Sequence, residues 1–358
     1  MTRFIIRRLL SSIPVMLGIV LLVFILARVI PGDPCTATYG EKATPELCAQ
    51  FEIRYGLNKP IPEQFVIYIG AIAQGDLGNS IKFGRPVTEL LLERLPITFE
   101  LTIVALLFAS IVGITLGLMS ATRRNSPVDV LTMIVANLGV SIPVFVLGLL
   151  LAFIFAVLLK DTPLALPPSG RLSPGVSVVP LAEAWGLVDL QGPLRAIVDF
   201  LSNMYVFNTL VTGQWGALAD ALKHLILPAI AVGTIPLAII ARMTRSSLLE
   251  VLGLDYVRTA RAKGLKERSV VVRHGMRNAL LPVVTVIGLS LGAFLSGAIL
   301  TETIFNLTGM GRTLFEAIEG RDYIVIQGVT IVVAMAYLLV NLLVDVSYAF
   351  LDPRIRLG

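Results

Sequence analysis

Charged residues and metal-binding side chains are scarce in this sequence. Only 15% of its 358 residues are charged, and histidine and cysteine occur twice each. It contains no G-x-x-x-x-G-K-[ST] phosphate loop, no H-E-x-x-H pair and no G-x-S-x-G elbow, and Gly309-Met310-Gly311 does not continue into a dinucleotide-binding fingerprint. We therefore expect no metal site, no bound cofactor and no enzymatic activity in this chain by itself.

Long apolar runs decide the fold class. With 56% hydrophobic residues and a mean hydropathy of +0.84, the chain has too little polar surface for a water-soluble globule. A transmembrane helix needs about 20 mostly apolar residues, whereas the strands of a membrane β-barrel have roughly 10. Six such runs predict an all-α membrane protein with six transmembrane helices, at residues 9–30, 98–121, 129–159, 224–243, 281–301 and 324–351.

The distribution of basic residues predicts the orientation. A cytoplasmic N terminus places 16 of the 29 basic residues, against five acidic ones, in or beside the cytoplasmic segments 1–8, 122–128, 244–280 and 352–358. This bias follows the positive-inside rule and puts both termini in the cytoplasm. The same positive charge is favourable next to anionic lipid head groups, so the basic pI can be explained without a nucleic-acid partner. The outer segments are then 31–97 and 160–223, and residues 98–351 form a core of five spans.

The two cysteines, Cys35 and Cys48, both fall in the first outer segment. An oxidising exterior would allow a disulfide between them. Two unpaired thiols are equally compatible with the sequence, and both alternatives stay open.

Uncharged polar residues within the spans are candidates for the lining of a translocation path. Runs two to five have no ionisable residue in their middle, which argues against an ion-coupled carrier. Hydrogen bonds between helices are the alternative role for each candidate. The candidates are Asn137, Ser141, Thr285, Ser290 and Ser296.

Three further features concern helix packing. Gly113-x-x-x-Gly117 and Gly288-x-x-x-Gly292 predict close approach of neighbouring helices. Asp345 is the one deep acid of the last run, and we expect it to pair with an arginine at the cytoplasmic side.

The segment 255–282 carries seven basic and two acidic residues in an otherwise apolar chain. A helix predicted over 246–263 ends at Gly264, a typical C-terminal stop. A second helix follows, and its predicted apolar row is Val272, Met276 and Leu280. Two helices that meet at a glycine would form a protruding elbow. A basic loop resting on anionic lipid is the alternative.

The order of residues in this elbow resembles the cytoplasmic loop of ABC importer permeases, in which an E-A-A-like triplet and a glycine precede a later L-P. Arg258-Thr259-Ala260 stands at the triplet and Leu281-Pro282 at the L-P, and RTARAKGL followed by RNALLP is typical of the peptide and nickel branch. The resemblance implies that an ATPase subunit contacts Arg258, Thr259, Ala260, Arg261, Ala262, Lys263 and Gly264.

The resemblance extends over nearly the whole chain. Residues 55–60 (YGLNKP), 75–80 (GDLGNS) and 95–101 (LPITFEL) are similar to the first outer loop of the "B" type of dipeptide and oligopeptide permease. Thr308 stands where proline is usual, and the 160–220 insertion is longer than the compact form of the family. The resemblance implies an outer gate that contains Glu302, Phe305, Gly309, Gly311 and Arg312.

The family resemblance implies a type I importer permease fold and a multi-pass location in the cell (inner) membrane of a bacterium or archaeon. A second homologous permease subunit, two ABC ATPase subunits that bind ATP and Mg²⁺, and an extracytoplasmic substrate-binding protein would complete the assembly. Dipeptides, longer peptides, nickel chelates and oligosaccharides are the substrates known in the family. A self-sufficient channel or ion-coupled secondary transporter is the alternative function.

Overall fold

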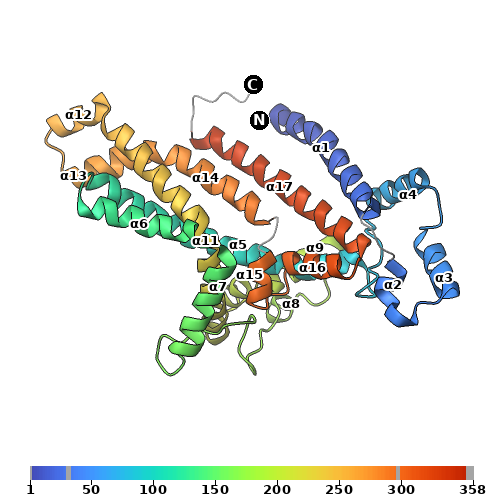
Figure 1. Cartoon of the computed structure of the whole chain (residues 1–358). Helices are drawn as coiled ribbons and strands as arrows, with labels where there is room; N and C mark the ends of the chain where they lie inside the picture. The colour runs from blue at the N-terminus through green and yellow to red at the C-terminus, as the bar shows by residue number, and fades with distance from the viewer. Residues whose placement is uncertain (1, 30–33, 296–298, 352–358) are drawn as a thin grey trace.

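The structure is a computed structural model that describes residues 2–29, 34–295 and 299–351 (Figure 1). The secondary structure of these residues is helical. The described residues also contain one isolated antiparallel β-bridge, between Asn79 and Pro86. The observed architecture agrees with the all-α prediction.

Five helices of the described ranges have spans long and apolar enough to cross a membrane. A sixth span arises if α6 and α7 are counted as one, although their axes differ by 103°. The break lies at Ile142-Pro143, where the proline ring disfavours a helical conformation of the preceding residue. The five helices are α1 (Thr2–Val29), α5 (Val87–Thr122), α11 (Trp215–Leu252), α14 (Arg277–Leu295) and α17 (Tyr323–Leu351).

Several predicted boundaries differ from the structure. The run 129–159 is not one straight helix, because α6 (Pro127–Ser141) ends before Pro143 and α7 (Val144–Phe153) continues into a π-helix, Ile154–Leu158. Helices α5 and α11 also begin well before their predicted spans. A hydrophobic run marks only the apolar part of a helix, and the polar turns that extend it outward do not appear in such a search.

The outer segments contain short helices. The first contains α2 (Pro34–Tyr39), a 3₁₀ turn (Gly40–Lys42), α3 (Pro45–Tyr55) and α4 (Ile61–Ala73), and the second contains α8 (Leu181–Ala184), α9 (Gly192–Asn203) and α10 (Tyr205–Val211). A disulfide between Cys35 and Cys48 joins α2 to α3. Of the two alternatives left by the sequence, the structure has the paired form.

Glycines set the close contacts between the long helices, as the sequence predicted. A Cβ on Gly113 would lie 2.8 Å from the carbonyl oxygen of Leu237, and one on Gly117 would lie 2.5 Å from that of Ala241, so α5 packs directly on the backbone of α11. Gly288 faces Val344 in the same manner, where α14 meets α17.

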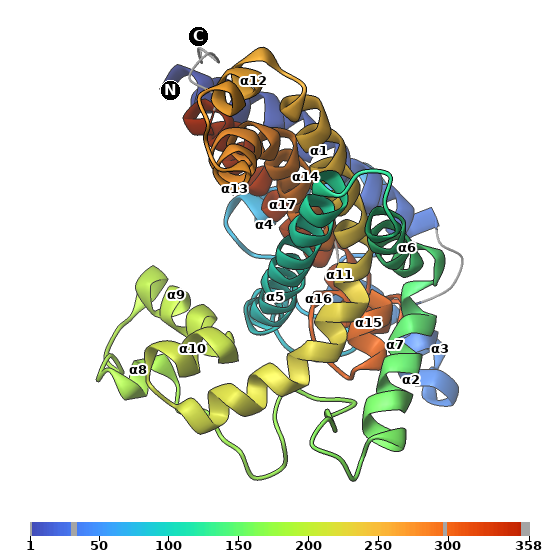
Figure 2. The ribbon, with the colours of Figure 1, turned by 90° about the vertical axis from the view of Figure 1, so that its left-hand side faces the viewer.

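The bundle has two distinct ends. Helix α12 (Asp255–Ala262) lies at the same end as the start of α1 and the end of α17, whereas α2, α3 and α8–α10 lie toward the opposite end (Figures 1 and 2). At the α12 end, Arg8 of α1 forms an ion pair of 3.0 Å with Asp345 of α17. The expected arginine partner of Asp345 is thus Arg8.

Candidate functional site

The elbow is built from a break in a long helix. Helix α11 ends at Leu252, Leu254 is extended (ψ 152°), and α12 begins at Asp255. The predicted continuous helix 246–263 is therefore wrong at this point, because Gly253 and Leu254 interrupt it. Gly264 follows α12 with φ +76°, a left-handed conformation that favours glycine, and a Cβ there would meet no atom within 4 Å.

Helix α12 has one buried and one exposed side. Val257 is fully buried and Ala260 is 6% exposed, and both pack in an apolar cluster with Leu248 of α11 and Met276. Six of the seven predicted contact residues are exposed: Arg258, Thr259, Arg261, Ala262, Lys263 and Gly264. Only Ala260, the residue that matches the triplet consensus, faces inward. The helix is thus anchored by its apolar side, and its polar side is exposed.

Polar contacts fix the elbow to the beginning of the fifth span. The phenol of Tyr256 donates a hydrogen bond to the His274 carbonyl (3.3 Å) and accepts one from the Asn278 side-chain amide (2.7 Å). Arg261 forms a two-point ion pair with Glu267 (2.8 and 3.1 Å), and this hydrogen bonding raises the pKa of the Arg261 guanidinium. Sequence reasoning missed Tyr256 and Asn278, because their spacing along the chain gives no periodic signal.

A π-helix changes which residues of the second elbow helix are buried. Helix α13 (Glu267–Ser269) continues as a π-helix, Val270–Met276, before α14 begins. The wider turn shifts the register, so Val271 and Gly275 are buried with Met276 while Val272 is 52% exposed. The predicted apolar row is therefore wrong at Val272.

A buried ion pair supports the base of the elbow. Asp129 of α6, 5% exposed, accepts hydrogen bonds from Nε and Nη2 of Arg245 on α11, both at 2.8 Å. It also accepts one from the Ser120 hydroxyl of α5. The role of Asp129 was not predicted from the sequence. A lone acid that follows Arg123 and Arg124 is the signal that was available.

Three of the predicted outer-gate residues, Gly309, Gly311 and Arg312, lie around the carboxylate of a fourth, Glu302. Glu302 of α15 (Ile299–Ile304) is fully buried, and its oxygens accept hydrogen bonds from the Thr98 hydroxyl (2.7 Å) and the Arg312 backbone N–H (2.9 Å). A Cβ on Gly309 would lie 2.7 Å from this carboxylate, and one on Gly311 would lie 2.9 Å from the Ile299 backbone. Both glycines therefore permit the close approach. Burial raises the pKa of the Glu302 carboxyl, while the hydrogen bonds act in the opposite direction.

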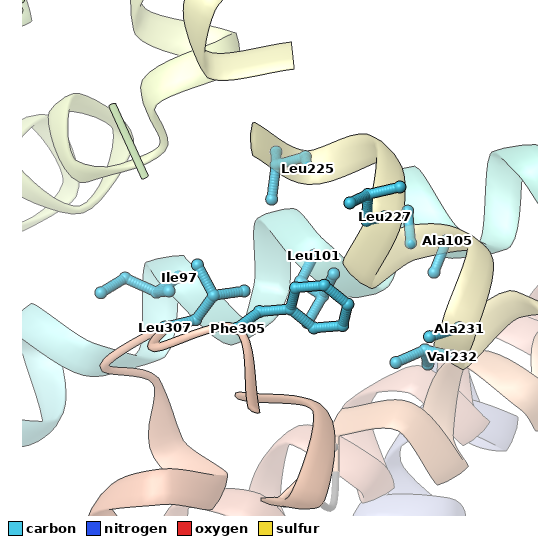
Figure 3. Packing of buried hydrophobic residues seen from close by; sticks show 10 residues of the cluster. Ile97, Leu101, Ala105, Leu225, Leu227, Ala231, Val232, Phe305 and Leu307 are labelled. Carbon is cyan, nitrogen blue, oxygen red and sulfur yellow. The ribbon is translucent and has the colours of Figure 1, made fainter. Parts of the chain in front are cut away.

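Phe305 belongs to a neighbouring apolar cluster. Its ring is 1% exposed and lies toward Leu101 of α5 and Leu227 of α11 (Figure 3). The Phe305 carbonyl accepts a hydrogen bond from Gly170 N–H at 2.9 Å, which connects the second outer segment to this region. The side chain of Arg312, in α16 (Met310–Glu319), donates to Glu316 at 2.8 Å. The structure thus gathers these residues, and their gating role stays a prediction.

The predicted path residues are dispersed over α6 and α14. The hydroxyls of Ser141, Thr285 and Ser290 donate to backbone carbonyls one turn earlier in their own helices. They therefore need no hydrogen-bond acceptor from another helix. The side-chain oxygen Oδ1 of Asn137 accepts a hydrogen bond from Nη1 of Arg242 of α11 at 2.6 Å, an interhelical contact. Ser296 lies outside the described residues. The lining role of this set stays a prediction.

Comparisons with known proteins agree over the full length of the chain. The profile of the family "Binding-protein-dependent transport system inner membrane component" matches residues 113–357, and the N-terminal profile of such membrane components matches residues 1–102. The chain belongs to this permease family. Its membership favours the importer over the self-sufficient channel or ion-coupled carrier.

Individual relatives of this permease are similar over almost all of both chains. The dipeptide transport system permease protein DppB of Alkalihalophilus pseudofirmus is 45% identical, over 98% of each chain. The protein of the same name in Escherichia coli K12 is 45% identical over 99% of each chain, and the di/tripeptide permease DppB of Pseudomonas aeruginosa is 44% identical over the same share.

One further contact of the permease was not foreseen from the sequence. Arg171, in the 160–223 segment, forms an ion pair of 3.1 Å with Glu100 of α5, whose other oxygen accepts the Val206 backbone N–H. The Arg171 guanidinium also lies 3.6 Å from the ring centroid of Tyr205. Glu100 therefore fastens the second outer segment to a central helix of the permease.

Proposed function

We propose that this chain is the translocation subunit of an ATP-driven importer that moves di- and oligopeptides into the cytoplasm. The named relatives support a peptide substrate, and the length of the match supports the same architecture. The chain has six spans in a type I importer permease fold, both termini in the cytoplasm, and a location in the inner membrane of a bacterial or archaeal cell.

The partners follow from this assignment. A second homologous permease subunit completes the pathway, and an extracytoplasmic binding protein delivers the substrate to it. Two ABC ATPase subunits bind ATP and Mg²⁺, whereas this chain binds neither and is not an enzyme by itself. ATP hydrolysis and the loaded binding protein bias a two-state switch between inward and outward access.

The single observation that supports this proposal most strongly is the two-sided elbow. Val257 and Ala260 fix α12 to the bundle, while Arg258, Thr259 and Arg261 remain exposed for contact with the ATPase. Because α12 continues from α11 through only Gly253 and Leu254, a push on the elbow moves a helix that packs on α5. At the opposite end, Glu302, Phe305, Gly309, Gly311 and Arg312 form the outer gate.

Substitution of Gly264 tests this role. Gly264→Pro fixes φ near −65° and removes the N–H that donates to the Arg261 carbonyl at 2.9 Å, so it should deform the elbow tip. We expect normal membrane insertion and copurification of the permease pair, with loss of substrate-stimulated ATP hydrolysis. Gly216→Ala, at an α11 glycine with open space around it, is the control. Normal stimulation in Gly264→Pro would refute the coupling role.

A further inference from the structure

A cavity of about 800 Å³ lies between the end of α1, helices α3 and α4, and the start of α17. It is separate from the elbow and from the Glu302 cluster. Its polar lining includes Arg28, Tyr68 and Gln327, and its apolar lining includes Ile61 and Ile67 of α4.

Gln327 of α17 lines this cavity and carries an unused hydrogen-bond donor. Its side chain is 4% exposed, and its Nε2 is buried with no hydrogen-bond partner among the described residues. A buried amide N–H without a partner is costly, so such a group in a cavity wall indicates a ligand acceptor.

Arg28, which lines the same cavity, is held rigidly. The guanidinium carbon lies 3.4 Å from the ring centroid of Phe24, and Tyr68 stacks on the same ring at 5.7 Å. Arg28 Nε donates to the Gln64 side chain at 2.9 Å, and Nη1 donates to the Phe24 carbonyl at 3.2 Å. No carboxylate of the described residues lies within ion-pair distance of Arg28. Arg28 is thus a fixed cation with no counter-charge among the described residues, and Gln327 adds an amide donor. Together they favour an anionic group with several hydrogen-bond acceptors.

The cavity lies at the level where the apolar spans end. The apolar part of α1 ends at Leu26, just before Arg28, and that of α17 begins at Tyr323, one turn before Gln327. Helix α4 is short and apolar, and Ile61 and Ile67 are 58% and 51% exposed beside the cavity. Hydrocarbon would cover these side chains, whereas water would leave them unfavourably hydrated.

We propose that this cavity binds a phospholipid, with the phosphate at Arg28 and Gln327 and an acyl chain along Ile61 and Ile67. Two carboxylates, Glu52 and Asp76, also line the cavity, but Asp76 accepts the Gly78 backbone N–H at 2.8 Å. Of the lining cations, Lys59 is paired with Glu63 at 2.9 Å, whereas Arg28 and Arg54 have no ion pair among the described residues. With the orientation proposed above, on which this step rests, the bound lipid belongs to the outer leaflet. A dipeptide would fill the polar part only and leave the α4 isoleucines exposed.

The test uses the full transporter, purified with its partner subunits, and phosphatidylethanolamine with a diazirine in one acyl chain. After irradiation, peptide mapping should locate the cross-link on α4. Arg28→Leu should lower this cross-linking by about tenfold, as expected for loss of a charge-assisted hydrogen bond. Gln327→Leu removes the unpartnered amide without leaving a cavity, should fold normally, and should lower it as well. Arg7→Leu, an exposed arginine on the same helix, is the control and should leave the α4 cross-link unchanged.

Competition experiments show whether the bound phosphate belongs to a membrane lipid or to a soluble ester. Unlabelled phosphatidylethanolamine should compete with the probe, while diacylglycerol, soluble glycerophosphoethanolamine and dialanine should compete at least about tenfold more weakly. Equal competition by diacylglycerol would refute the phosphate contact, and equal competition by the soluble ester would refute a membrane lipid as the occupant. Stronger competition by dialanine would make the cavity a peptide site. Unchanged α4 cross-linking in both Arg28→Leu and Gln327→Leu would overturn the proposal.

Discussion

The side-chain amide of Asn278 donates a hydrogen bond of 2.7 Å to the phenol oxygen of Tyr256. Tyr256 lies in the first turn of α12, and Asn278 lies in the first turn of α14. This contact therefore joins the elbow to the helix that re-enters the bundle after it. A force on α12 reaches two helices, α11 through the chain and α14 through this hydrogen bond.

Tyr256→Phe is expected to weaken coupling without unfolding the protein. It removes the hydrogen bonds to Asn278 and to the His274 carbonyl, worth about 1 kcal/mol together at this half-exposed site. We expect fewer substrate molecules transported per ATP hydrolysed, with a thermal unfolding midpoint lowered by no more than about 2–4 °C. Tyr39→Phe, on the outer helix α2, is the matched control. Equal transport per ATP in Tyr256→Phe and the unmodified transporter would show that this contact transmits nothing.

The loss of stability caused by a substitution of Glu302 should increase with the number of hydrogen bonds lost. Glu302→Gln keeps one oxygen acceptor, whereas Glu302→Ala leaves the Thr98 hydroxyl and the Arg312 N–H without their acceptor. We expect Ala to destabilise by about 3 kcal/mol and Gln by about half of that. Thermal unfolding of the purified complex measures the order of stability of the two variants. A Gln variant less stable than the Ala variant would contradict this view of the carboxylate as a double acceptor.

The Asp129–Arg245 pair should contribute more than an exposed ion pair. Asp129→Ala leaves Arg245, whose side chain is 29% exposed, without its counter-charge, and should cost about 3 kcal/mol. Arg261→Gln breaks the exposed pair with Glu267 and should cost less than about 1 kcal/mol. The double change Asp129→Leu with Arg245→Leu should recover much of the loss, because no unpaired charge remains. Similar unfolding midpoints for Asp129→Ala and Arg261→Gln would refute the distinction.

The sequence predicted those features that depend on local pattern. The apolar runs located the five long apolar helices and the bent α6–α7 pair, and the glycines at 113 and 117 indicated where α5 packs closely on α11. Gly264 was identified as the end of a helix because its left-handed conformation is a common stop. These properties follow from hydrophobic periodicity and from backbone sterics, which short stretches of sequence determine.

Features that depend on distant partners escaped prediction. Thr98 and Glu302 are 204 residues apart, and no local pattern links them. The π-helix at Val270–Met276 shifts the buried face by inserting a residue into a helical turn, and a search at the ordinary helical period does not detect it. The angle of 103° between α6 and α7, which meet at Pro143, likewise depends on the packing around both helices.

The central claim is that α12 transmits the motion of an ATPase subunit to the spanning helices. The most direct measurement attaches a photo-cross-linker at Thr259→Cys, on the exposed side of α12, in the assembled transporter during ATP turnover. A matched site at Lys160→Cys, in the second outer segment, provides the control. We expect cross-links from position 259 to an ATPase subunit and no cross-links to that subunit from position 160. Cross-links from position 259 to lipid alone, in a transporter that is hydrolysing ATP and moving substrate, would contradict it.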